Sequence, residues 1–268
     1  MTIKTGENRE TLFNESVVID SMSSLMKIIT LIGGFLVLVI SSTYLKTFKI
    51  YNIEYPVLIL SSILGMMVMI SSNDLIVFYM GLELQSLALY VLATYNRDQL
   101  KSSEAGLKYF VLSALSSGLL LYGCSLVYGF SGSTNFDIIS NQLNSEEYVL
   151  TFGIVFILVG LAFKISAVPF HMWAPDVYEG SPNTTTFFFA VVPKMALFIL
   201  LMRLCYVSFY NIFDSYQTVF FLLSMGSVFV GALGGLEQRR SCGIILPWVN
   251  LWSLLNLFQL NLIKVNYF

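Results

Sequence analysis

Apolar residues occur along this chain in long unbroken runs that short polar stretches separate. A helix that crosses the hydrocarbon core of a bilayer needs about 20 predominantly apolar residues, and about eight runs approach that length. They cover roughly residues 25–45, 56–72, 75–95, 107–129, 149–170, 184–207, 217–236 and 243–262. The sequence therefore predicts about eight transmembrane helices, of which the second is short.

The continuity of these runs favours helices over strands. A strand of a transmembrane barrel has about ten residues of alternating polarity, whereas these runs do not alternate. Only helices and closed barrels can pair every backbone polar group within lipid. We therefore predict an all-α polytopic membrane protein without a soluble domain.

The composition agrees with this fold class and excludes several kinds of function. Of the 268 residues, 56% are hydrophobic and 11% are charged, compared with about 25% charged in soluble domains. The net charge of −2 and the lack of a basic stripe argue against nucleic-acid binding. Three cysteines without a CxxC motif and a single histidine do not fit the usual zinc or iron–sulfur ligand patterns. We expect no metal in this chain.

The first 24 residues are polar and resemble no targeting signal. They lack the apolar centre of a signal peptide and are too acidic for a transit peptide. We therefore expect synthesis either inside an organelle or in a bacterium. Many Phe, Tyr, Ile and Asn residues with few Ala residues favour a mitochondrial genome. The expected location is the mitochondrial inner membrane, with the bacterial plasma membrane as the alternative.

The short loops differ in their content of lysine and arginine. The loops after the first, third and seventh runs are basic, and a further lysine lies at the start of the fourth run. These residues are Lys46, Lys49, Arg97, Lys101, Lys108, Arg239 and Arg240. Because basic loops stay on the cytoplasmic or matrix side, the N-terminal segment and the acidic loop 130–148 are predicted to face the opposite side.

Three ionisable residues, Glu83, Lys164 and Lys194, lie deep inside apolar runs. A charge in the bilayer core is costly and usually marks an ion or proton path. Structural alternatives exist: Glu83 could be a carboxyl group that hydrogen-bonds a neighbouring helix, and Lys194 could extend its amine to the interface. Lys108 lies about one turn inside its run and would by itself indicate an interfacial anchor.

Two prolines accompany the buried lysines. Pro169 follows Lys164 by five residues, and Pro193 directly precedes Lys194. Proline removes a backbone donor and kinks or breaks helices, so we expect a helix break near each proline. His171 follows the first break. It is either a packed side chain or a relay group, since imidazole titrates near neutral pH.

Three motifs occur together and in order. They are Gly81-Leu-Glu-Leu-Gln-Ser-Leu, then Glu104-Ala-Gly-Leu-Lys-Tyr-Phe, then Phe163-Lys-Ile-Ser-Ala-Val-Pro-Phe-His-Met-Trp-Ala-Pro-Asp-Val-Tyr-Glu-Gly-Ser-Pro. Over about residues 56–236 the chain resembles the chain 2 family of NADH:ubiquinone oxidoreductase, respiratory complex I, whose bacterial equivalent is subunit N. The combination of motifs is far more specific than any one of them.

This resemblance implies an antiporter-like module of two inverted five-helix repeats, each with a broken helix and a central charge. It implies proton-relay roles for Glu83, Lys108, Lys164 and Lys194. It further implies a subunit without a redox centre, so that NADH, FMN, iron–sulfur clusters and ubiquinone would bind other subunits. The expected partners are the other membrane-arm subunits of the complex.

The resemblance also predicts how the chain is divided. The expected segments are a polar segment (1–24), a flanking helix and loop (25–55), a five-helix repeat (56–207) and two further helices (208–268), the last part of which diverges from the family. The family's first helices and most of its second repeat have no counterpart. We expect a split gene in which a second chain completes the module, with truncation and frameshift as alternatives.

Three functions remain open at this stage. The first is redox-driven proton translocation as a complex I subunit. The second is a cation/proton antiporter subunit, since the same fold serves that class. The third is a structural subunit of the membrane arm that conducts no protons.

Overall fold

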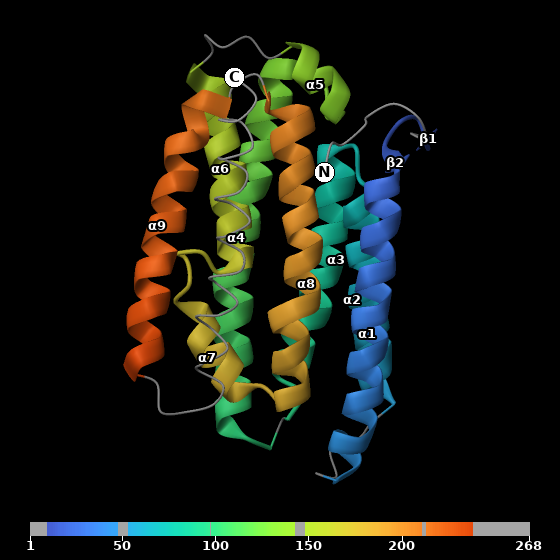
Figure 1. Cartoon of the computed structure of the whole chain (residues 1–268), viewed down its shortest axis with the longest axis vertical. Helices are drawn as coiled ribbons and strands as arrows, with labels where there is room; N and C mark the ends of the chain where they lie inside the picture. Colours follow the sequence, from blue (N-terminus) through green and yellow to red (C-terminus); the bar gives the residue numbers. More distant parts are fainter. Residues whose placement is uncertain (1–9, 48–52, 97, 143–147, 211–212, 238–268) are drawn as a thin grey trace.

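Helices dominate the computed structural model, which describes residues 10–47, 53–96, 98–142, 148–210 and 213–237. Most helices run side by side along the long axis, while α5 lies across one end (Figure 1). The helices are α1 (Ser21–Thr47), α2 (Glu54–Ser71), α3 (Leu75–Ala93), α4 (Leu100–Ser131), α5 (Phe136–Gln142), α6 (Tyr148–Ile165), α7 (Trp173–Gly180), α8 (Asn183–Arg203), the π-helical turn η1 (Leu204–Ser208) and α9 (Phe213–Glu237). The predicted all-α class is confirmed.

Within these residues, five helical segments are long and apolar enough to cross a membrane. They are α1, α2, α3, α4, and α8 together with η1. Helices α6 and α9 contain the shorter apolar stretches Leu150–Ile165 and Tyr216–Ala232. The chain is thus a multi-pass membrane protein. The predicted eighth span, at 243–262, lies outside the described residues, as do Arg239 and Arg240.

The fifth predicted span is too long, because α6 ends at Ile165 rather than near residue 170. Ser166 has a left-handed backbone with a φ of 65°. Its N–H donates to the carbonyl of Phe163 (3.0 Å), and the N–H of Ala167 donates to that of Ala162 (2.8 Å). These two bonds form a Schellman motif, which pairs the last carbonyls of a helix. The helix therefore breaks between Lys164 and Pro169, as the sequence predicted.

The second expected break is absent. Helix α8 continues without interruption through Pro193, so the prediction of a break at this residue is wrong. Proline has a backbone φ that suits a helix and removes a single backbone donor. Transmembrane helices tolerate it because neighbouring groups and local adjustments can compensate.

The N-terminal segment carries structure that the hydrophobic pattern did not reveal. Strands β1 (Glu10–Leu12) and β2 (Val17–Ile19) pair as an antiparallel hairpin. Helix α1 then begins at Ser21, four residues before the predicted start. Asp20 Oδ1 accepts from the Ser23 N–H (3.2 Å), and Ser23 Oγ accepts from the Asp20 N–H (3.0 Å). This reciprocal capping fixes the start of α1.

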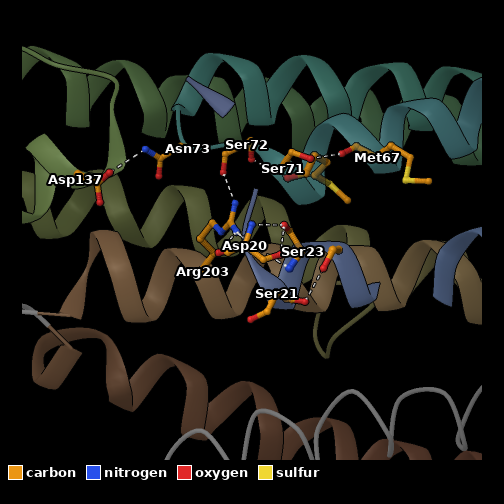
Figure 2. Close-up of polar contacts among 11 residues, drawn as sticks. Asp20, Ser21, Ser23, Met67, Ser71, Ser72, Asn73, Asp137 and Arg203 are labelled. Atoms are coloured by element: carbon orange, nitrogen blue, oxygen red, sulfur yellow. Dashed lines mark hydrogen bonds and ion pairs between the residues drawn. The ribbon is translucent and has the colours of Figure 1, made fainter. Parts of the chain in front are cut away.

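Polar contacts join the hairpin to the bundle at one end (Figure 2). Arg203, whose side chain is 9% exposed, donates to both carboxylate oxygens of Asp20 (2.8 Å each) and to the carbonyl of Ser72 (3.0 Å). Asn73 donates to Asp137 Oδ2 (2.9 Å), which lies in the first turn of α5. The loop predicted at 130–148 therefore contains a helix that is fastened to the link between α2 and α3.

Helices α2 and α3 approach each other closely through two glycines. A Cβ on Gly65 would lie 2.6 Å from the backbone nitrogen of Gln85, and one on Gly81 would lie 2.8 Å from that of Met69. Small residues let the backbones of membrane helices come into contact. This contact fixes the position of α3, which carries Glu83 and Gln85.

Candidate functional site

The two buried lysines line the same small cavity. Lys164 near the end of α6 is 8% exposed, and Lys194 on α8 is 7% exposed. The cavity has a volume of about 20 Å³ and is lined by residues of α3, α4, α6, α7 and α8. The structure therefore brings together Lys164 and Lys194, two of the residues that the sequence singled out, although they lie 30 positions apart in the chain.

Hydroxyl groups hold Lys164. Its Nζ donates to Ser113 Oγ (2.6 Å) and to the Tyr90 hydroxyl (3.2 Å). The Tyr90 hydroxyl in turn donates to Ser113 Oγ (2.6 Å). One small network thus connects α3, α4 and α6 at Lys164. Charge-assisted hydrogen bonds of this kind stabilise an ammonium group away from water.

Lys194 contacts the helix break itself. Its Nζ donates to Ser166 Oγ (3.0 Å), on the residue that ends α6. It also lies 5.9 Å from the centroid of the Tyr178 ring on α7, within the range of cation–π attraction. The central lysine of α8 is therefore tied to both halves of the broken segment.

Glu83 lies near Lys164 without pairing with it. Glu83 is half-buried, and its Oε1 has no hydrogen-bond partner among the described residues. It is close enough to Lys164 for an electrostatic interaction, but no ion pair joins the two side chains in the part of the chain that the structure describes. Glu83, Ser86 and Tyr90 follow each other at helical spacing on one face of α3. That face thus leads from the carboxylate to the hydroxyl partner of Lys164.

His171 and Lys108 lie apart from the cavity. His171 is half-buried in the link between α6 and α7, and its Nδ1 has no partner among the described groups. Lys108 is 44% exposed and pairs with Asp176 Oδ2 (2.7 Å) and Glu104 Oε1 (2.9 Å). Neither residue lines the cavity. Exposed ion pairs contribute about 0–1 kcal/mol each, and of the two Lys108 pairs only the one with Asp176 joins α4 to α7.

Sequence reasoning did not single out the aromatic side of the cavity. The Trp173 indole N–H donates to the carbonyl of Phe163 (3.0 Å), close to the break. The indole also stacks on Tyr109, with 4.6 Å between ring centroids and an interplanar angle of 13°. Both rings line the cavity. Trp173 lies within the motif of the broken helix, which was the available signal, whereas nothing local marks Tyr109.

Comparisons with known proteins identify the family to which the chain belongs. Residues 72–241 match the family model described as NADH:quinone oxidoreductase/Mrp antiporter, transmembrane. NADH-quinone oxidoreductase subunit N of Pelagibacter ubique is 70% identical over 229 residues, which are 85% of this chain and 49% of the relative. The chain spans about half the length of the curated relatives it matches.

Solved structures share the fold. A chain of respiratory complex I from Thermus thermophilus has a TM-score of 0.76 and 28% identity, covering 92% of this chain and 52% of the other. A chain of the Mrp complex from Dietzia sp. has a TM-score of 0.75 and 23% identity, covering 90% of this chain and 46% of the other. The chain belongs to the NADH:quinone oxidoreductase/Mrp antiporter transmembrane family.

Proposed function

We propose that this chain is a proton-translocating subunit in the membrane arm of an NADH:quinone oxidoreductase. The observation that carries the proposal is the placement of Lys164 and Lys194 on one buried cavity at a helix break. Two amines in lipid are costly to maintain unless they serve an ion path. The relative at 70% identity is named for this enzyme.

The relay works through changing partners of Lys164. In the described arrangement Lys164 binds Ser113 and Tyr90, while Glu83 lies nearby without an ion pair. In a second arrangement Glu83 pairs with Lys164 and holds it protonated. Two charges 4 Å apart at an effective dielectric constant of 20 interact by about 4 kcal/mol. Making and breaking this pair is therefore sufficient to drive a proton from Lys164 toward Lys194.

The remaining parts of the system belong to other polypeptide segments under this proposal. NADH, FMN, iron–sulfur clusters and ubiquinone bind other subunits, whose redox chemistry supplies the energy. Lys108 and His171 serve proton entry or exit rather than the central transfer, since they lie away from the cavity. The family's second repeat comes from a further segment, either of this chain or of a separate one.

Bacterial relatives support a bacterial plasma membrane over the mitochondrial inner membrane.

Replacement of the charges tests the proposal. We expect Lys164→Met, Lys194→Met and Glu83→Gln to lower proton pumping in inside-out vesicles by at least about tenfold, which corresponds to about 1.4 kcal/mol. NADH-dependent proton uptake and oxidation are measured together, with native gels to check assembly. Leu84→Met, at an exposed position of α3, is the control and should pump normally.

Two results would contradict the proposal. Normal pumping in all three charge variants would leave the chain a structural subunit. A chain that never migrates with NADH dehydrogenase activity on native gels would favour an independent antiporter. Mass spectrometry of the same intact complex identifies the polypeptide that carries the second repeat.

A further inference from the structure

Gln85 on α3 is buried with an unpaired acceptor. The side chain is 4% exposed, and its Oε1 has no hydrogen-bond partner among the described residues. Buried amide oxygens in proteins almost always accept a hydrogen bond, from protein or from ordered water. The mechanism proposed above gives this residue no role, although it lies two positions after Glu83.

Gln85 lies on the cavity that both lysines share. Leu82, Gln85, Ser86 and Leu89 line it together from α3, and their spacing places them on one helix face. The backbone of Gln85 packs against Gly65 of α2, where a Cβ would come within 2.6 Å of its nitrogen. This close contact with α2 fixes the position of the α3 backbone at Gln85, a residue that lines the cavity.

The cavity has the size and the polar groups that one water molecule requires. Its volume of about 20 Å³ exceeds the roughly 10–15 Å³ that a cavity must offer to hold a single water, and a buried water needs two to four polar partners. Lys164, Lys194 and Gln85 all line the cavity, and the buried Gln85 Oε1 has no hydrogen-bond partner among the described residues. An ammonium can only donate hydrogen bonds, so when the water donates one hydrogen to a neutral Lys194 amine, a third group must accept its other hydrogen.

We infer that Gln85 positions one water molecule between Lys164 and Lys194, and that this water carries the proton from one amine to the other. The inference rests on the proposed function and deepens it. The Lys164 ammonium gives a proton to the water while the water gives one of its own to the neutral Lys194 amine. One N–H bond breaks and one forms, and the water is regenerated. Gln85 keeps its protons and accepts one hydrogen bond from the water.

The first test compares two replacements of Gln85 in vesicles that contain the assembled complex. Gln85→Met keeps the length of the side chain but removes the strong acceptor, whereas Gln85→Glu keeps an acceptor oxygen. Since one hydrogen bond shifts an equilibrium by about two- to tenfold, we expect Gln85→Met to lower pumping by that factor. Gln85→Glu should pump faster than Gln85→Met. Gln217→Met, the same change on α9, is the control and should pump normally.

The second test locates the water in the unmodified complex. A high-resolution cryo-electron microscopy map should contain one ordered water within hydrogen-bond distance of the Gln85 oxygen and of a lysine nitrogen. The same map of Gln85→Met should lack it. A water that is bound elsewhere in the cavity, or a Gln85→Met complex that pumps normally, would overturn the inference. If Lys164→Met and Lys194→Met also pump normally, the proposed function itself fails.

Discussion

Ser166 occupies a backbone conformation that usually belongs to glycine. Its φ of 65° places it in the left-handed region, which costs an L-residue other than glycine about 1–2 kcal/mol. Its hydroxyl group accepts from Lys194 (3.0 Å), a contact that glycine could not provide. The cost of the conformation is therefore explained by the partner that Ser166 supplies to a buried amine.

Two replacements of Ser166 separate these effects. Ser166→Gly removes the hydroxyl and relieves the backbone, while Ser166→Ala removes the hydroxyl and keeps the backbone cost. We expect both variants to pump protons more slowly than the wild type and to a similar extent. In denaturation of the purified protein, Ser166→Gly should be more stable than Ser166→Ala by about 1 kcal/mol. Equal stability, or normal pumping by Ser166→Gly, would contradict this role.

The sequence identified the charged residues of the site but not their neutral partners. Lys164 and Lys194 are conspicuous because charges are rare inside apolar runs. Ser113, Tyr90 and Gln85 are not conspicuous, since small polar residues are common in membrane helices and their pairing depends on how the helices rotate against each other. Lys108 was grouped with the relay by resemblance, yet it lies at an exposed ion pair.

At the scale of the element, the hydrophobic runs predicted where the helices lie but were less accurate about where each helix begins and ends. The run 149–170 crosses the Schellman motif at Ser166 because Ile165, Ala167 and Val168 are apolar on both sides of it. The start of α1 depends on the Asp20–Ser23 capping pair, which hydropathy does not register. Helix ends are set by hydrogen bonds of single residues, so a composition window misplaces them by a few positions.

The ion pair between Asp20, which directly follows the hairpin, and Arg203 of α8 should contribute stability that depends on pH. Burial disfavours ionisation of Asp20, but hydrogen bonds from Ser23 and the charge of Arg203 outweigh it and lower its pKa below the ordinary value of 3.8. A carboxylate with a lowered pKa contributes stability above its unfolded pKa and loses that contribution as the pH falls through the folded value. The contribution of Asp20 should therefore be complete near neutral pH and decrease below about pH 4.

Comparison of Asp20→Asn with the wild type measures this effect. At pH 7 we expect the free energy of unfolding of the variant to be about 1 kcal/mol lower than that of the wild type, because the asparagine leaves Arg203 without its anionic partner. Between about pH 4 and pH 2 the difference should shrink. Glu10→Gln, on the exposed strand β1, is the control. A difference in unfolding free energy that stays constant across this range would contradict a stabilising role for the Asp20 charge.

At the scale of the whole molecule, the two ends carry different chemistry. One end holds the hairpin, α5 and the Arg203 contacts (Figures 1 and 2). The other end holds the start of α4, where Lys101 pairs with Glu179 (3.3 Å) and Lys108 with Asp176 (2.7 Å). Basic residues of short loops remain on the cytoplasmic side. The start of α4 should therefore face the cytoplasm.

Cysteine labelling in intact cells tests this orientation. Asn14, in the exposed turn of the hairpin, and Leu100, 83% exposed at the start of α4, mark the two ends. In a background with Cys242→Ser, Asn14→Cys should react with a membrane-impermeant maleimide added outside the cell, and Leu100→Cys should react in inside-out vesicles. Cys124 and Cys205 are buried and should give little background. The reverse labelling pattern would invert the topology.

The Schellman end of α6 has an electrostatic consequence. Peptide dipoles in a helix add up to about half a negative charge at the carboxyl end, and the end of α6 lies inside the bundle rather than in water. Lys164 is in that last turn, and Lys194 contacts the residue that follows it. The broken backbone thus acts as a fixed, non-titrating counter-charge that two amines share. Such a counter-charge cannot be protonated, so in the proposed relay it would keep its strength during proton transfer between the two lysines.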